Sequence, residues 1–187
     1  ILREMGQEIR GLYERNDVRI RLLEGMEEGK HWFATDLCPE PGAVTTEIVE
    51  NGIEYTVDVE NGQKTGFFLD QKYNRQAIAK HARECGFISL DPPAFTKSGS
   101  TVKNAIRGYK EINLKAMKLL PRGGYLATCS CSYFMKEELF VKMLQDAAHD
   151  ANVSLRQIEA RQQSPDHPIL WQVPETNYLK FYIFQVV

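Results

Sequence analysis

The second half of the chain alternates between helix-like and strand-like patterns of hydrophobic residues. Apolar side chains recur at intervals of three and four residues in three segments, which predicts helices over residues 74–81, 102–120 and 136–148. Shorter apolar runs between and after them predict buried strands at residues 87–90, 125–129, 153–160 and 178–187. Strands that alternate with helices of this length are typical of an α/β protein with a parallel sheet.

The first 70 residues follow a different pattern. Leu2, Met5, Ile9, Leu12 and Tyr13 would share one face of an amphipathic helix over residues 2–15, and the glycines and prolines of residues 24–43 predict a loop. Asn-Gly at 51–52 separates two strand-like runs, 47–50 and 53–59, and is a strong hairpin signal, and a second Asn-Gly at 61–62 predicts another turn. We therefore expect a small β-rich domain over residues 1–70 and an α/β domain over residues 71–187.

Composition changes this picture little. The 187 residues are 43% hydrophobic and 26% charged, with a net charge of −2, which excludes disordered, collagen-like, coiled-coil and disulfide-dense classes. No run of about 18 apolar residues predicts a membrane span. The charge is −5 over residues 1–82 and +3 over residues 83–187. This basic second half is compatible with a polyanionic partner but is weaker than that of a dedicated nucleic-acid binder.

The four cysteines do not predict disulfides. Because the sequence shows no secretory signal, a reducing cytoplasm is the expected location. Cys129 and Cys131 form a C-x-C pair, which lacks the spacing and the second pair of ligands of a zinc site. No metal is therefore expected. The start, Ile1-Leu2, is not an initiator methionine, and we expect the sequence to begin partway through a protein.

Two polar clusters follow successive predicted strands of the α/β region. The first is Asp91-Pro92-Pro93-Ala94-Phe95, whose carboxylate and carbonyls could face a planar amine and whose Phe95 could stack on a ring; a plain strand-to-loop turn is the simpler alternative. The second is Thr128-Cys129-Ser130-Cys131-Ser132, which suits a thiol nucleophile or, alternatively, two small buried side chains. Because ligands of open α/β sheets bind at the carboxyl ends of strands, the co-occurrence of both clusters is more informative than either alone.

Weaker candidates lie elsewhere. Lys103, Arg107 and Lys110 share one side of the 102–120 helix, either as a solvated face or as contacts to a phosphate backbone. Asp166-His167-Pro168 is more typical of a loop with a hydrogen-bonded histidine than of a metal site.

A series of motifs resembles one enzyme family. It resembles the bacterial 23S ribosomal RNA cytosine-C5 methyltransferases, which are class I S-adenosylmethionine (SAM) enzymes. The motifs occur in the family's order along nearly the whole chain: 64–71 (KTGFFLDQ), 91–95 (DPPAF), 107–113 (RGYKEIN), 123–124 (GG), 128–132 (TCSCS) and 166–168 (DHP). The implied fold class is α/β, a Rossmann-like methyltransferase sheet preceded by a small β-rich α+β domain.

The resemblance also shows what this sequence lacks. Family members carry an RNA-binding PUA domain before the β-rich domain, and no such segment is present here. Between Ala82 and Phe87 they carry the first half of the catalytic sheet, with the Gly-rich loop and the acidic residue that embrace SAM. Only Arg83-Glu84-Cys85-Gly86 stand there, and the chain contains no G-x-G. We expect the segment to be omitted from the sequence, because a half-sheet would expose an apolar edge.

The resemblance implies a mechanism with Cys131 as nucleophile. Its thiolate adds to cytosine C6, C5 then attacks the SAM methyl group, and loss of the C5 proton expels the thiol. Cys129 stands where the family tolerates other residues and is expected to be structural. Asp91 and the Pro92 carbonyl would accept from the cytosine amino group, and Phe95 would stack on the flipped base. No general base is identified.

The remaining implied roles concern SAM and RNA. The cofactor-binding residues would be Lys64, Thr65, Phe67, Asp70, Gln71 and Pro92, and the substrate-binding residues Pro93, Phe95, Arg107, Lys110 and His167. The expected partner is ribosomal RNA, with a homodimer left open and no membrane. Two alternatives stay open: a non-catalytic RNA-binding or assembly module, and a methyltransferase that acts on another RNA position.

Overall fold

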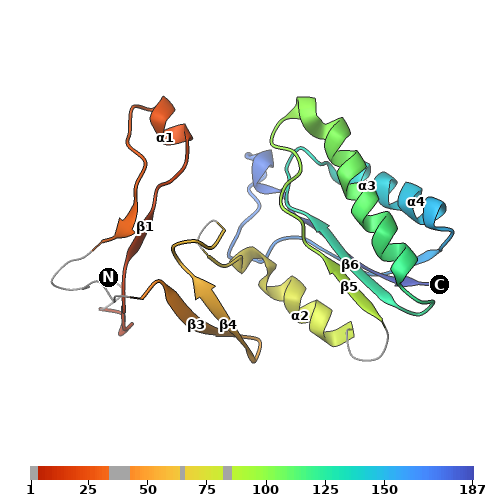
Figure 1. Cartoon of the computed structure of the whole chain (residues 1–187), viewed down its shortest axis with the longest axis horizontal. Coiled ribbons are helices and arrows are strands. Elements are labelled where there is room, and N and C mark those ends of the chain that lie inside the picture. The colour runs from red at the N-terminus through yellow and green to blue at the C-terminus, as the bar shows by residue number, and fades with distance from the viewer. Residues whose placement is uncertain (1–3, 34–42, 64–65, 82–85) are drawn as a thin grey trace. The chain divides into compact units, whose positions relative to one another are not determined.

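The computed structural model describes residues 4–33, 43–63, 66–81 and 86–187. The chain divides into two compact units, Ile1–Phe68 and Leu69–Val187, each of which is treated by itself (Figure 1). The join predicted near residues 82–86 falls mostly outside the described residues. Within the described part, no helix is long and apolar enough to cross a membrane.

The second unit is built on a four-stranded sheet. Its order is β5 (Phe87–Leu90), β6 (Tyr125–Ser130), β8 (Lys180–Val186) and β7 (Leu155–Arg161). β5 and β6 are parallel, whereas β8 runs antiparallel to both β6 and β7. The prediction of a parallel sheet is therefore wrong for β8. The physical reason is the connection from β7 to β8, which contains only the short 3-10 turn Pro174–Thr176 and no crossover helix.

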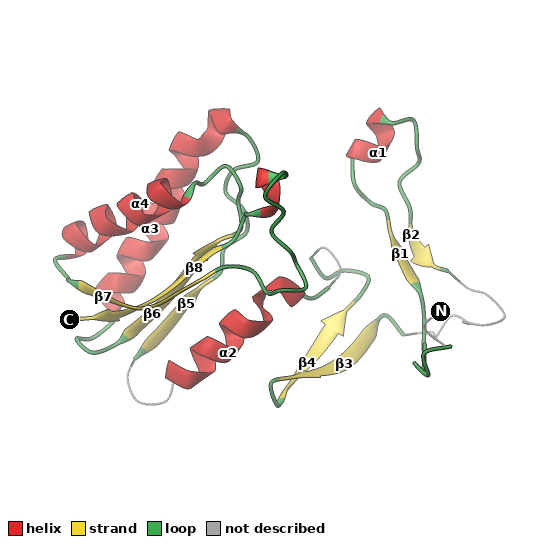
Figure 2. Cartoon of the chain, turned by 180° about the vertical axis from the view of Figure 1, so that it is seen from behind, coloured by secondary structure: helices red, strands yellow, loops and turns green. Residues whose placement is uncertain are grey.

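Helices cover both faces of this sheet. α3 (Val102–Leu119) and α4 (Glu137–Ala151) lie on one face, and α2 (Lys72–His81) lies on the other (Figures 1 and 2). Because successive strand residues point to opposite faces, Leu126 of β6 joins the α3–α4 core while Ala127 and Cys129 join the α2 side. All three predicted helices and all four predicted strands of this unit are confirmed, with ends that differ by at most three residues.

The first unit contains two antiparallel strand pairs. β3 (Thr45–Glu50) and β4 (Ile53–Asp58) form the predicted hairpin, with Asn51 at φ 53° and Gly52 at φ 78°. Positive φ at both central residues is the geometry that Asn-Gly favours in a two-residue turn. β1 (Tyr13–Arg15) pairs with β2 (Lys30–Trp32), and the short helix α1 (Ile20–Leu23) lies between them in sequence.

The prediction of a helix over residues 2–15 is wrong. Residues 4–6 form a turn in which Gly6 has φ +75°, a value outside the right-handed helix, and the chain then extends into β1. Of the predicted apolar face, Tyr13 packs edge-on against Trp32 with 4.8 Å between ring centroids, whereas Met5 and Leu12 are exposed. The predicted loop over residues 24–43 likewise contains β2, while residues 1–3 and 34–42 lie outside the described residues.

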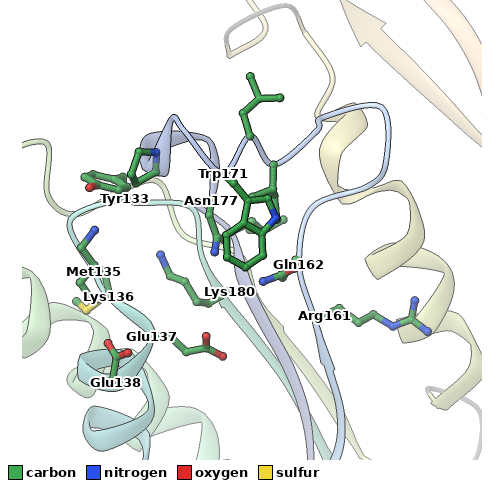
Figure 3. Close-up of a pocket in the computed structure, with 14 residues that line it drawn as sticks. Tyr133, Met135, Lys136, Glu137, Glu138, Arg161, Gln162, Trp171, Asn177 and Lys180 are labelled. Atoms are coloured by element: carbon green, nitrogen blue, oxygen red, sulfur yellow. The ribbon is translucent and has the colours of Figure 1, made fainter.

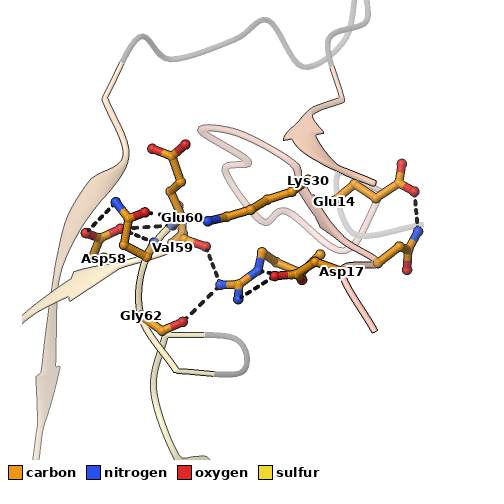
Figure 4. A network of polar contacts seen from close by, with 10 residues as sticks. Glu14, Asp17, Lys30, Asp58, Val59, Glu60 and Gly62 are labelled. Carbon is orange, nitrogen blue, oxygen red and sulfur yellow. Dashed lines mark hydrogen bonds and ion pairs between the residues drawn. The ribbon is translucent and has the colours of Figure 1, made fainter. Parts of the chain in front are cut away.

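A polar network joins β1 to the turn after β4 (Figure 4). The Arg15 guanidinium donates to the backbone oxygens of Val59 at 3.1 Å and Gly62 at 3.0 Å. In the same turn, the Asp58 carboxylate accepts from the backbone N–H groups of Asn61 and Glu60, and these bonds, that from Asn61 first, hold its pKa below the ordinary value. The second Asn-Gly therefore forms the predicted turn, and Arg15 ties that turn to β1.

The α3 core supports a stability prediction. Met117 is completely buried, whereas Leu119, two residues later on the same helix, is 76% exposed. Met117→Ala should lower the free energy of unfolding by about 2–5 kcal/mol because it leaves a cavity. Leu119→Ala should change it by less than about 0.5 kcal/mol. Urea unfolding followed by circular dichroism measures both, and equal costs would contradict the assignment of the α3 core face.

Candidate functional site

The site begins where β5 and β6 end. Their parallel register pairs Leu90 with Thr128, so that Asp91 and Cys129 follow side by side. The Cys129 thiol donates to Asp91 Oδ1 at 2.9 Å. The two polar clusters singled out in the sequence therefore meet at one edge of the sheet, as predicted.

The segment before α2 completes this edge. The 3-10 turn Leu69–Gln71 places the Gln71 amide against Asp91 Oδ1 at 3.4 Å and against the Cys129 sulfur at 3.5 Å. Asn74 Nδ2, one turn into α2, donates to Gln71 Oε1 at 2.6 Å and so fixes the orientation of the amide. Gln71 and Asn74 are buried, which makes this a packed polar network.

Asp70 is held from the opposite direction by the segment between β7 and β8. The Tyr178 hydroxyl donates to Asp70 Oδ2 at 2.8 Å, and the backbone N–H of Ser164 donates to the Asp70 carbonyl at 3.1 Å. Burial, and then the neighbouring Asp70 carboxylate, raise the pKa of Tyr178, which keeps it a donor. Of the two residues predicted at the cofactor, Gln71 thus contacts Asp91, whereas Asp70 contacts Tyr178 and Ser164.

The two cysteines after Ala127 differ in environment. Cys129 is 1% exposed, and burial followed by the adjacent Asp91 carboxylate raises the pKa of its thiol well above the ordinary value. Cys131 is half-buried and lies one residue beyond the end of β6, on the α2 side of the sheet. Cys129 therefore stays protonated and donates to Asp91, as expected of a structural thiol, while the role of Cys131 as nucleophile stays a prediction.

Lys180 is a buried cation beside the cysteine segment. It is 7% exposed, pairs with Ser130 in the sheet, and its ammonium donates to the carbonyls of Ser132 at 2.6 Å and Tyr178 at 2.7 Å. Burial lowers the pKa of Lys180 to about 8, and negative charge on Cys131 partly offsets this. Lys180 and Cys131 are therefore close enough to interact electrostatically.

Sequence reasoning missed Lys180, Asn74, Tyr178 and Ser164. The only signal for Lys180 was a single lysine within the apolar run 178–187, which also fits an exposed strand end. The other three are common polar residues whose partners lie far away in sequence, as with Tyr178 and Asp70. Long-range pairings of this kind carry no local pattern.

The predicted base-stacking residue is partly used in packing. The Phe95 ring contacts Tyr109, with 4.6 Å between centroids, and is 37% exposed. A Cβ at Gly108 would lie 3.1 Å from this ring, so glycine there lets Phe95 approach α3. Pro92 is half-buried and Pro93 is exposed, both in the same loop.

The other predicted substrate contacts are dispersed. Lys110 forms an ion pair with Asp150 at 2.6 Å that joins α3 to α4, and Arg107 is exposed one turn earlier on α3. His167 Nδ1 lies 3.4 Å from Asp166. The substrate-binding roles of these three residues stay predictions.

The rest of the predicted cofactor segment lies outside the second unit or outside the described residues. Lys64 and Thr65 lie outside the described residues. Phe67 belongs to the first unit, where its ring packs at 5.2 Å from Tyr55. Their roles also stay predictions.

Comparison with known proteins indicates the same class of enzyme, the methyltransferases, that the sequence motifs resemble. The chain is 32% identical over 249 residues to ribosomal RNA large subunit methyltransferase I of Pseudoalteromonas atlantica, an alignment that covers 95% of this chain and 62% of that protein. The same enzyme of Aeromonas hydrophila is 33% identical, with 90% and 60% covered. The chain is similar to ribosomal RNA large subunit methyltransferases. It spans about three fifths of their length, and no protein-family model matches it.

Solved structures show the fold. A candidate SAM-dependent methyltransferase from Streptococcus mutans superposes with a TM-score of 0.66 at 16% identity, over 94% of this chain and 61% of that one. A second candidate methyltransferase, in complex with SAH, gives a TM-score of 0.63 with the same coverage and identity. The α/β unit is therefore a Rossmann-like methyltransferase fold, and the predicted fold class is confirmed.

The alignment lengths show that the relatives contain more residues than this chain. An alignment of 249 positions exceeds the 187 residues of the chain, so at least 62 positions of the Pseudoalteromonas protein have no counterpart here. In the described residues β5 is hydrogen-bonded on one side only.

The buried Lys180 supports a prediction about pH. Its pKa is lowered to about 8 in the folded state from an ordinary 10.5, so between these values only the unfolded chain keeps the proton. Stability should therefore rise with pH across this window. Relative to Lys180→Met, the wild type should gain about 2–3 kcal/mol from pH 7 to pH 10. Urea unfolding at both pH values measures this, and a pH-independent difference would contradict the burial of the ammonium.

Proposed function

We propose that this chain is the catalytic part of a SAM-dependent methyltransferase that forms 5-methylcytosine in large-subunit ribosomal RNA. One observation carries the proposal: the parallel pairing of β5 and β6 brings Asp91 into contact with Cys129, two residues before Cys131, at one edge of a methyltransferase sheet. The similarity to ribosomal RNA methyltransferases over 95% of the chain supports RNA as the substrate.

Cys131 would activate the base. Cytosine C5 is a poor nucleophile, but attack of the Cys131 thiolate on C6 forms a C–S bond and moves the C5–C6 π electrons to the ring. C5 then becomes nucleophilic. Once C5 carries the methyl group, and the bond of that group to the SAM sulfur has broken to leave S-adenosylhomocysteine, a base would remove the C5 proton. The electrons of that C–H bond would re-form the C5–C6 double bond and expel the thiolate, so that Cys131 is regenerated. SAM supplies the electrophilic methyl group.

Asp91 would select cytosine over uracil. A carboxylate only accepts hydrogen bonds, and the exocyclic amine of cytosine is a donor, whereas the corresponding uracil oxygen is not. Cys129 and Gln71 both direct a donor to Oδ1, which fixes the carboxylate, and Asp91 is nevertheless exposed. The Pro92 carbonyl and Phe95 follow in the same loop and would complete the base site.

The described residues fit one wall of a SAM site. Pro92 and Gln71 offer a carbonyl and an amide at the end of β5, and Asp70 precedes Gln71 in the 3-10 turn Leu69–Gln71. The opposite wall would stand beyond the open edge of β5. The relatives' unmatched positions are numerous enough to supply two β-α units there.

Substitution of the nucleophile gives the direct test. Cys131→Ser should lower methyl transfer from SAM to large-subunit RNA by roughly 10³-fold or more in the full protein, because the hydroxyl does not replace the thiolate. Cys129→Ser keeps a donor to Asp91 and should retain activity within about tenfold. Transfer of tritiated methyl groups measures both variants.

Two results would contradict the proposal. Unchanged activity of Cys131→Ser would remove the covalent mechanism. Methylation at a position other than cytosine C5, read by mass spectrometry of the digested RNA, would replace the proposed product by another RNA position.

Two observations favour a second candidate function: the positions of the relatives that have no counterpart in this chain, and the open edge of β5. A chain without the first half of the sheet would act as a non-catalytic RNA-binding or assembly module. Titration calorimetry with SAM separates the two: the enzyme binds SAM, whereas the module gives no heat even at millimolar SAM. An intact mass well above the 21.4 kDa of this sequence would favour the enzyme.

A further inference from the structure

A cavity of about 350 Å³ adjoins the cysteine segment (Figure 3). Its walls come from the turn between β6 and α4, the end of β7 and the segment between β7 and β8. The side chains that matter for recognition are Tyr133, Lys136, Glu138, Arg161, Trp171 and Lys180. The volume is at the lower end of the range for small-ligand sites and suits one planar ring.

Trp171 is the most unusual residue of this cavity. Its side chain is 93% exposed, the highest value for any large apolar residue in the described part of the chain. The turn that carries it is nevertheless well tied: Thr176 Oγ1 accepts from the Leu170 backbone N–H at 2.8 Å and donates to the Val173 carbonyl at 2.7 Å. An indole held outward by an ordered turn suits a stacking platform.

Cations and aromatic rings alternate around the same space. The Lys136 ammonium lies 3.3 Å from the centroid of the Tyr133 ring. Neither Lys136 nor Lys180 has a carboxylate within ion-pair distance among the described residues, whereas Arg161 is paired with Glu159 at 2.5 Å. Glu138 adds an exposed acceptor. A nucleobase next to a phosphate matches this mixture of donors, acceptor and rings better than a phosphate alone.

The cavity is connected directly to the proposed nucleophile. Tyr133 follows Cys131 by two residues, and Lys180 donates to the carbonyl of the intervening Ser132 at 2.6 Å. A group bound in the cavity would therefore contact the same short backbone segment that carries Cys131. In an RNA duplex the bases are stacked and paired, so only an unpaired base can enter a pocket of this kind.

We propose that this cavity, named here the Trp171 pocket, binds an unpaired nucleobase that neighbours the target cytosine, stacked on the indole of Trp171. The proposal rests on the proposed function, because it takes RNA as the substrate. It assigns Trp171 to substrate binding and gives it no part in the reaction at Cys131.

Fluorescence provides a direct readout, because the sequence contains only two tryptophans. In a Trp32→Phe background Trp171 is the sole tryptophan, and stacking should quench its emission during titration with a 12-nucleotide single-stranded RNA rich in cytidine. Trp171→Ala should weaken binding of this RNA about tenfold and raise the KM for RNA with little change in kcat. Trp171→Phe should restore most of the affinity, and Leu119→Ala, an exposed residue on α3, should bind as the wild type.

Several outcomes would overturn the pocket assignment. These are unchanged RNA affinity of Trp171→Ala, unchanged emission at saturating RNA, or loss of a co-purifying protein in Trp171→Ala while RNA affinity stays the same. The last result would assign the surface to a protein partner.

Cys131→Ser separates this proposal from the proposed function. If Cys131→Ser loses methyl transfer but RNA does not quench the emission of Trp171, the proposed enzyme function is supported and the Trp171 pocket is contradicted. If RNA quenches the emission of Trp171 and Cys131→Ser keeps full activity, the Trp171 pocket is supported and the covalent mechanism is contradicted.

Discussion

The site depends on the parallel register of β5 against β6. Pairing of Leu90 with Thr128 brings the ends of the two strands level, so that Asp91 receives the Cys129 thiol at 2.9 Å and Cys131 follows immediately beyond. A shift by one residue would move Cys129 to the other face of the sheet, among the residues of α3 and α4. Successive residues of β6 are buried on opposite faces of the sheet, with Leu126 toward α3 and α4 and Ala127 toward α2. This burial specifies the register.

The same register gives the two similar cysteines different environments. Burial and a neighbouring carboxylate keep Cys129 protonated, which makes it a donor that orients Asp91. Cys131 leaves the sheet where Lys180 places an ammonium close by. The cost of burying that ammonium is consistent with a functional use, since an apolar residue at the same position would fold more easily.

Much of this arrangement could be predicted from the sequence, and the reasons differ by element. The helices α2, α3 and α4 have continuous apolar faces, Asn51-Gly52 specifies a two-residue turn, and Asp91-Pro92 ends a strand. The helix predicted over residues 2–15 is wrong because Gly6 and the long-range pairing of β1 with β2 outweigh the helical spacing of its apolar residues. The antiparallel β8 and the contacts of Lys180 and Tyr178 depend on partners distant in sequence, which periodicity does not encode. Lys64 and Thr65 themselves lie outside the described residues, so their cofactor roles stay predictions.

The central claim is that Cys131 bonds covalently to cytosine C6, and trapping that bond tests it most directly. RNA with 5-fluorocytidine at the target blocks loss of the C5 substituent, so the adduct persists after reaction with the full protein and SAM. The account predicts a denaturation-resistant complex whose cross-linked peptide carries the nucleotide on Cys131. Absence of a complex with RNA whose unmodified form is methylated, or a cross-link on Cys129, would contradict it.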